Sequence, residues 1–262
     1  MNIRIRWCGE LADCGLNRVL PIDEIHVWYR AINDRFAHPD PQLDCYYEVL
    51  SAAERERAAR FLVESPRTLF VSTRATLRMV LGSYLDQPPA TIEFAYPAQG
   101  KPVLAGEITD LRFNVSHTHG LAALAFTRGC EIGVDVEQLR PECEAGQLAE
   151  RFFSQEERRA LSGLSGPSLQ QAFFRCWTRK EAYVKAKGGG LSIPLDQFDV
   201  SVADGDPATL LSTRPDPGEA DRWMLHDLPV PAGYAGALAV SVSAEGRKPL
   251  LQDVDVPNFA SF

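Results

Sequence analysis

A pattern that occurs twice is the feature that most constrains how this chain folds. Ser51-Ala-Ala-Glu54 and Ser154-Gln-Glu-Glu157 both fit the capping box, in which a Ser and a Glu side chain satisfy free backbone amides of a helix's first turn. Each box begins a helix, and a longer helix is expected after it, at about residues 66–85 and 168–187. The chain therefore repeats a pair of helices at an interval of 103 residues, measured between the two serines.

Two further matches support an internal duplication. Thr73-Arg74 in the first long helix corresponds to Thr178-Arg179 in the second, 105 residues later. A short apolar strand that begins at Gly120 corresponds to one that begins at Gly236, 116 residues later. Because the intervals differ only by loop-sized amounts, we expect an α/β protein built as a pseudodimer of two similar α/β halves. Chance matching of short segments is the alternative.

The length of 262 residues is compatible with two coupled cores, and we expect the halves to be residues 1–127 and 128–262. With 45% hydrophobic and 24% charged residues, the composition excludes disordered and collagen-like classes. No apolar run approaches the roughly 18–20 residues of a membrane span, and the N-terminal residues lack the apolar stretch of a signal peptide, so a cytoplasmic protein is expected. Six cysteines without a C-x-x-C pair favour reduced thiols.

The charge distribution excludes general nucleic-acid binding but leaves a local anion site open. The net charge is −8, whereas nucleic-acid binding rests on clustered Lys and Arg. Residues 151–190 nevertheless carry eight basic and three acidic residues, a local charge of +5. The basic residues of this window are Arg151, Arg158, Arg159, Arg175, Arg179, Lys180, Lys185 and Lys187. The window predicts either an anion site or a solvated helix face, and composition favours the helix face.

Two carboxylates share one face of a predicted strand at residues 132–137. Ile132, Val134 and Val136 alternate with Gly133, Asp135 and Glu137, a period of two that places both carboxylates on the same side. Neighbouring carboxylates repel unless a cation lies between them, and Mg²⁺ prefers such oxygen ligands. The strand therefore predicts a metal site, or else a solvent-facing side of a sheet.

A third carboxylate lies in the helix at 168–187. Glu181 and Lys185 are four residues apart on one face, a spacing typical of surface ion pairs. The glycines at 188–190 end the helix and permit close approach of a backbone or a ligand. The run does not have the Walker order, and the chain contains neither G-x-S-x-G nor H-E-x-x-H, the common signals of esterases and zinc proteases.

Four segments, taken in order, resemble the motifs of the surfactin-type (Sfp-type) 4′-phosphopantetheinyl transferases. They are Phe113-Asn-Val-Ser-His-Thr118, Ile132-Gly-Val-Asp-Val-Glu137, Arg151-Phe-Phe-Ser154 and Trp177-Thr-Arg-Lys-Glu-Ala-Tyr-Val-Lys185. Gly100-Lys-Pro102 and Gly188-Gly-Gly-Leu-Ser192 also fit this family. The resemblance implies a pseudodimer of two α/β halves with coenzyme A in the cleft between them. It also implies transfer of the phosphopantetheine arm to a serine of an apo carrier protein, with release of adenosine 3′,5′-bisphosphate.

By the same resemblance, Asp135, Glu137 and Glu181 are expected to bind Mg²⁺, with Mn²⁺ as an alternative metal. The catalytic residues implied are Asp135, Glu181 and Lys185, the last stabilising or protonating the departing phosphate oxygen. Either a water on the metal or Glu181 would take the proton of the carrier serine, and both alternatives stay open. The third ligand in this scheme is either Glu137 or a water.

The residues implied in coenzyme A binding are Arg57, Arg67, Thr68, Lys101, Ser116, His117, Lys180 and Lys185. Glu54 departs from the family, which often has Lys there. Its carboxylate either faces the 3′-phosphate pocket and weakens phosphate binding, or closes the capping box with Ser51 and points away. Two rival functions remain open, a metal-dependent nucleotide hydrolase and a non-catalytic carrier-binding protein.

The expected partners are apo carrier proteins of the acyl, aryl or peptidyl kind, serving fatty acid, polyketide or nonribosomal peptide synthesis. Because carrier proteins are acidic, the basic window is one candidate contact surface. Leu148, Phe152 and Phe153 are candidate apolar contacts, with core packing as the alternative for the two phenylalanines. The chain length favours a monomer over the small trimeric type, and neither a nucleic acid nor a membrane is expected as a partner.

Overall fold

The structure, a computed structural model, describes residues 2–8, 19–32, 43–97, 101–106 and 109–242. Its first sheet has the order β1-β2-β6-β5. The strands are β1 (Asn2–Trp7), β2 (Glu24–Ala31), β5 (Leu111–Thr118) and β6 (Leu121–Arg128). β1 and β2 run parallel, whereas β6 pairs antiparallel with both β2 and β5. Gly120, at the turn between β5 and β6, has a φ of +77° that favours glycine.

A second sheet has the order β10-β11-β7, with antiparallel pairing throughout. Its strands are β7 (Ile132–Gln138), β10 (Trp223–Asp227) and β11 (Tyr234–Ser241). Two small antiparallel ribbons accompany the sheets. They consist of β3 (Phe94–Ala95) with β4 (Val103–Leu104), and of β8 (Phe198–Val200) with β9 (Leu210–Thr213).

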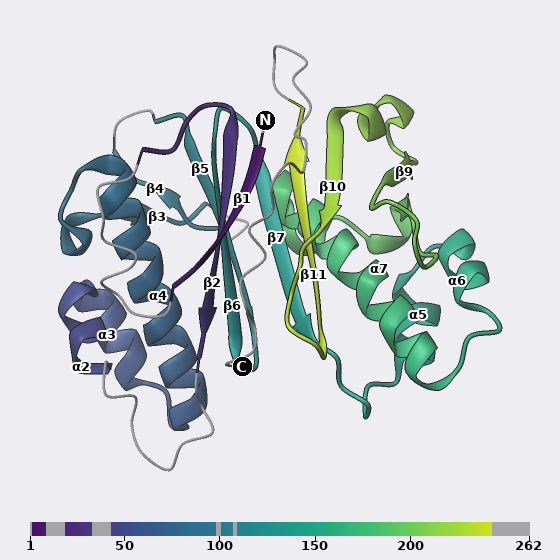
Figure 1. Ribbon diagram of the computed structural model, residues 1–262, viewed down its shortest axis with the longest axis horizontal. Helices are drawn as coiled ribbons and strands as arrows, with labels where there is room; N and C mark the ends of the chain where they lie inside the picture. Colours follow the sequence, from purple (N-terminus) through teal and green to yellow (C-terminus); the bar gives the residue numbers. More distant parts are fainter. Residues whose placement is uncertain (1, 9–18, 33–42, 98–100, 107–108, 243–262) are drawn as a thin grey trace.

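The helices form two groups that flank the sheets (Figure 1). The first group is α2 (Leu43–Val49), α3 (Ala52–Ala59) and α4 (Glu64–Leu85), and the second is α5 (Ala145–Phe152), α6 (Gln155–Leu161) and α7 (Gly166–Lys187). Short 3₁₀ turns lie at Pro89–Thr91, Gly190–Ser192, Leu195–Gln197 and Pro217–Arg222. Both predicted capping boxes are present, at the starts of α3 and α6. Each long helix begins two residues earlier than predicted.

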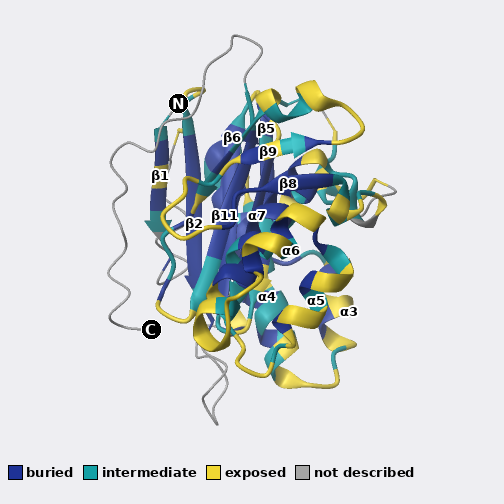
Figure 2. Cartoon of the chain, turned by 90° about the vertical axis from the view of Figure 1, so that its right-hand side faces the viewer, coloured by how far each residue is buried: buried dark blue, intermediate teal, exposed yellow. Residues whose placement is uncertain are grey.

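The core lies in layers between these helices. Ile132, Val134 and Val136 of β7 pack against apolar residues of β1, β2 and β6, so the two sheets face each other. α4 covers the other face of the first sheet, and α7 covers that of the second. Figure 2 shows the consequence, with buried residues concentrated in the strands and exposed residues on the outer sides of the helices. The α/β class expected from the sequence is confirmed.

Along the chain, β6 is the last strand of the first sheet and ends at Arg128, one residue past the predicted boundary, and β7 of the second sheet begins at Ile132. Each half contributes one 22-residue helix and one capped short helix. We propose the division into halves 1–127 and 128–262 on this ground.

The cysteines differ in their state. Cys45, Cys130, Cys143 and Cys176 are free thiols, as their isolated spacing predicts. Cys8 is disulfide-bonded, so the expectation of a reduced thiol is wrong for this residue. Spacing along the chain carries no information about which sulfur atoms approach in space.

None of the helices in the described part of the chain is both long and apolar enough to cross a membrane.

Candidate active site

Gly133 brings strand β7 and helix α7 into unusually close contact. A Cβ atom at this position would lie 2.1 Å from the carbonyl oxygen of Ala182 and 2.3 Å from the amide nitrogen of Ala186. Real Cβ atoms do not approach backbone that closely, so only glycine fits against this turn of the helix. Because Asp135 lies on the same face of β7 as Gly133, its side chain is directed toward α7.

Asp135 is the centre of a polar cluster between the two sheets and α7. Its side chain is almost fully buried, and Oδ1 accepts hydrogen bonds from Lys185 Nζ at 2.5 Å and from Ser116 Oγ at 2.9 Å. Lys185 Nζ also donates to Ser116 Oγ at 2.9 Å. The second carboxylate oxygen, Oδ2, is buried and has no hydrogen-bond partner. A buried carboxylate oxygen without a partner is costly, and a cation would satisfy it.

Glu137 and Glu181 lie within electrostatic range of Asp135. Burial, and then the charge of Asp135, raises the pKa of each of these carboxyls above its usual value. Lys185 opposes the shift at both residues, and Arg140 opposes it at Glu137. Three mutually repelling carboxylates are the oxygen ligands that Mg²⁺ takes. As they stand, however, no three His, Cys, Asp or Glu side chains of the described chain converge closely enough to hold a metal.

Apart from Lys180 and Lys185 on α7, the predicted coenzyme residues lie on the first sheet, just before β4, and on the α3–α4 pair. His117 is on β5, and burial together with the charges of Lys185 and Arg57 lowers its pKa. Arg57 stacks over the Phe70 ring at 4.8 Å, and Arg67 lies one helical turn before Phe70, 3.5 Å from Glu64. Thr68, the next residue of α4, is buried.

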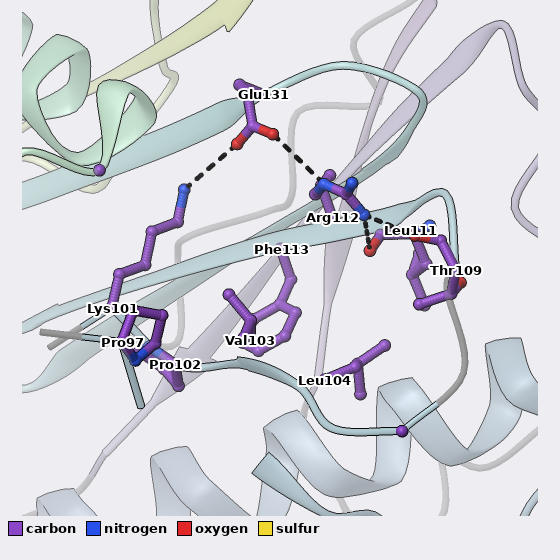
Figure 3. A pocket seen from close by; sticks show the side chains of 12 residues that line it. Pro97, Lys101, Pro102, Val103, Leu104, Thr109, Leu111, Arg112, Phe113 and Glu131 are labelled. Carbon is purple, nitrogen blue, oxygen red and sulfur yellow. Dashed lines mark hydrogen bonds and ion pairs between the residues drawn. The ribbon is translucent and has the colours of Figure 1, made fainter. Parts of the chain in front are cut away.

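Lys101 borders a hollow with a volume of about 430 Å³ at the starts of β5 and β7. Its Nζ donates to the carbonyl oxygen of Ile132 at 2.9 Å and lies 4.0 Å from Glu131. Arg112 approaches Glu131 from the opposite side at 3.3 Å, above an apolar floor that includes Val103 and Phe113 (Figure 3). The sequence did not predict a role for Glu131 or Arg112, because no local pattern indicates that the two side chains contact each other.

Lys180 is not at the site, so the expectation that it binds coenzyme A is wrong. Its side chain is fully buried, and Nζ donates to Glu157 Oε1 at 2.5 Å and to the carbonyl oxygen of Phe198 at 2.7 Å. Adjacent residues of a helix point about 100° apart, so Glu181 faces Asp135 while Lys180 turns toward α6 and β8.

Glu54 closes the capping box and does not face a phosphate pocket. Its carboxylate accepts hydrogen bonds from the amide of Ser51 at 2.9 Å and from Arg78 Nε at 2.6 Å. Arg74 Nε lies 3.5 Å from its other oxygen, Oε1. Of the two arrangements expected from the sequence, the capping arrangement is the one present.

The basic window offers little free positive charge. Seven of its eight basic residues form ion pairs with carboxylates; only for Arg151 does the structure instead record a stacking contact, with the ring of Phe152. Among the apolar carrier candidates, Phe153 is buried in the core and stacks on Phe173, whereas Leu148 and Phe152 are only partly buried. The core alternative is therefore correct for Phe153, and ion pairing explains the charge run.

Comparison with known proteins supplies the family. Residues 131–239 match the model of the 4′-phosphopantetheinyl transferase superfamily, and residues 38–128 match that of the 4′-phosphopantetheinyl transferase N-terminal region. The 4′-phosphopantetheinyl transferase HetI of Nostoc sp. is 36% identical over 89% of this chain and 93% of its own length. The chain belongs to the 4′-phosphopantetheinyl transferase family. It is therefore an enzyme of that class, and the resemblance of its motifs is confirmed.

More distant members of the 4′-phosphopantetheinyl transferases match less of the chain. Sfp of Bacillus subtilis (strain 168) is 29% identical over 59% of this chain and 67% of its own length. Among solved structures, a holo-(acyl-carrier-protein) synthase from Bacillus anthracis, in complex with CoA, is 25% identical. That match covers 44% of this chain and 96% of the solved chain, with a TM-score of 0.36.

Proposed function

We propose that this 4′-phosphopantetheinyl transferase uses the cluster around Asp135 to move the phosphopantetheine group from coenzyme A to a serine of an apo carrier protein. The observation that supports this most directly is the partnerless, buried Oδ2 of Asp135, close to the charges of Glu137, Glu181 and Lys185. Such a set is suited to a divalent cation and a phosphate group together. The products are holo-carrier protein and adenosine 3′,5′-bisphosphate.

Asp135, Glu137 and Glu181 would hold the Mg²⁺ ion, or Mn²⁺ in its place. Bound there, the metal would offset the negative charge that develops on the pyrophosphate oxygens during displacement. The repulsion that raises the pKa of Glu137 and Glu181 is relieved when a divalent charge is shared among the three carboxylates.

Lys185 would hold or protonate the departing phosphate oxygen. In the structure its ammonium group is shared between Asp135 and Ser116, so it lies next to the proposed metal and points into the site. Either Glu181 or a water on the metal would take the proton of the carrier serine.

Coenzyme A would bind across β5, between the α3–α4 pair and α7. Arg57, Arg67, Thr68 and His117 would contact its 3′-phosphate and pyrophosphate, with Ser116 beside the metal. Lys101 would reach the adenine-side phosphates once its ammonium group leaves the Ile132 carbonyl. Burial lowers the pKa of Lys101, a penalty that a phosphate partner would offset.

The proposed partners are acyl, aryl or peptidyl carrier proteins, and we propose a monomeric, cytoplasmic enzyme. Leu148 and Phe152, which are partly buried on α5, are the remaining apolar candidates for carrier contact.

The deciding assay incubates the enzyme with coenzyme A, Mg²⁺ and an apo-carrier protein, and follows the mass of the carrier. Asp135→Asn and Glu181→Gln should each lower the rate of phosphopantetheine transfer by about 10²-fold or more, because each removes a charged ligand. Asp221→Asn is the matched control, since its carboxylate is exposed and lies outside the cluster. Rates within a few-fold of the parent at saturating Mg²⁺ would contradict the metal assignment.

A further inference from the structure

Within the described residues, the edge of β7 that faces β5 has no backbone partner. β7 pairs with β11 along its other edge, and β6 is the one described strand that pairs with β5. The amides of Val134, Val136 and Gln138 alternate with those directed at β11 and therefore point toward β5. Since Val134 and Val136 are fully buried, these amides would be costly to leave without acceptors.

Side chains of β5 provide the missing acceptors. The amide of Val134 donates to Asn114 Oδ1 at 2.9 Å, that of Val136 to Ser116 Oγ at 3.3 Å, and that of Gln138 to Thr118 Oγ1 at 3.2 Å. In each pair the acceptor side chain lies 20 residues before the amide. We call Asn114, Ser116 and Thr118 the side-chain ladder, because they replace the carbonyl groups of an ordinary parallel strand.

The ladder alternates with the proposed metal ligands. Asp135 lies between the amides that bond to Asn114 and Ser116, and Glu137 lies between those that bond to Ser116 and Thr118. Two rungs also touch a carboxylate directly, since Ser116 Oγ donates to Asp135 and Thr118 Oγ1 donates to Glu137 Oε2 at 3.4 Å. A hydroxyl has one proton, so accepting from an amide directs that proton to the carboxylate.

We propose that Asn114 and Thr118 are positioning residues that, through the side-chain ladder, fix the register of β7 and hold the carboxylates of Asp135 and Glu137 where a divalent cation binds. The metal part of this inference rests on the proposed function. Groups that orient a metal ligand commonly change metal affinity about 10- to 100-fold when they are removed.

The test compares Thr118→Val, which keeps the shape and removes the hydroxyl, with Thr118→Ser, which keeps the hydroxyl. Asn114→Leu removes the acceptor of the first rung. The matched control is Thr127→Val on β6, where the structure records a buried threonine hydroxyl without a hydrogen-bond partner. Two properties are measured: Mn²⁺ binding to the coenzyme-loaded protein by electron paramagnetic resonance, and amide hydrogen exchange by NMR.

We expect Thr118→Val to weaken Mn²⁺ binding about 10-fold or more and to speed exchange at the Gln138 amide by a similar factor. Asn114→Leu should speed exchange at Val134 in the same way. Thr118→Ser should stay within a few-fold of the parent, and Thr127→Val should match it in both properties.

Parental Mn²⁺ affinity in Thr118→Val, or an equal loss in Thr118→Ser, would overturn the positioning role. Unchanged exchange at Gln138 in Thr118→Val would overturn the ladder itself. If the parent protein bound no Mn²⁺, the proposed metal site would be wrong instead, and the exchange data alone would decide the ladder.

Discussion

Replacing Gly133 by alanine tests whether the contact between β7 and α7 assembles the active site. The added Cβ would meet backbone atoms of Ala182 and Ala186 at 2.1 and 2.3 Å, whereas ordinary contacts begin at 3.4 Å. Backbone cannot rotate away as a flexible side chain can, so the helix must move by more than 1 Å relative to the strand. Glu181 is part of the turn that is pushed away, and Lys185 directly precedes Ala186.

The variant is expected to stay folded and to lose most of its activity. Overpacking of this kind costs about 1–3 kcal/mol, which a domain of this size survives. A displacement of about 1 Å at a catalytic group, by contrast, lowers rates on the order of 10²-fold. The 2.5 Å bond between Lys185 and Asp135 leaves little slack for such a shift.

The assay measures carrier modification at saturating coenzyme A and Mg²⁺, with circular dichroism to confirm that Gly133→Ala is folded. Gly146→Ala on α5 is the control, because a Cβ there meets nothing within 4 Å and its backbone is helical. A folded Gly133→Ala variant with the kcat of the parent would refute the reasoning, since the helix would then have no need to lie so close.

Three other perturbations follow from the ionisable groups. Lys180→Met should lower stability by about 3–5 kcal/mol in chemical denaturation, because Glu157 is left buried without its partner, while the KM for coenzyme A stays unchanged. Glu181→Gln should raise the Tm of the metal-free protein at pH 7 but leave it unchanged at a pH below 4.5, the usual pKa of a glutamate. Because the pKa of Glu181 is raised in the folded protein, its ionised carboxyl destabilises the fold only as the pH increases. An equal change in Tm at both pH values would contradict this reasoning. Glu54→Lys should lower the Tm, because it breaks the cap and adds a third cation beside Arg74 and Arg78. The same variant should leave the ratio of the KM values for coenzyme A and dephospho-coenzyme A unaltered. A changed ratio would mean that Glu54 does face the phosphate pocket.

Regular periodicity made much of this site predictable. The alternation at 132–137 placed the carboxylates of Asp135 and Glu137 on one face of the strand. The four-residue spacing placed Glu181 and Lys185 on one face of the helix. Both depend only on backbone geometry, so the sequence suffices to predict them. The polar period of Asn114, Ser116 and Thr118 was equally visible, but its meaning depends on a strand 20 residues away.

Residues whose role depends on distant partners were predicted less well. In both halves the glutamate of a capping box also binds a cation on the following long helix, Glu54 with Arg78 and Glu157 with Lys180. The box itself is a local signal that four residues carry. The cation lies 24 or 23 residues away, and nothing in its own neighbourhood distinguishes it from a phosphate-binding residue.

The side-chain ladder also bears on the solubility of the protein. An open strand edge is a template on which another chain can add by backbone pairing, a common route to aggregation. Here β5 and β7 cover each other's edges without sharing backbone bonds, so the seam is sealed by three small polar side chains. Loss of one side chain of the ladder would expose the edges of both β5 and β7. The seam that carries the carboxylates would then become the site at which molecules aggregate.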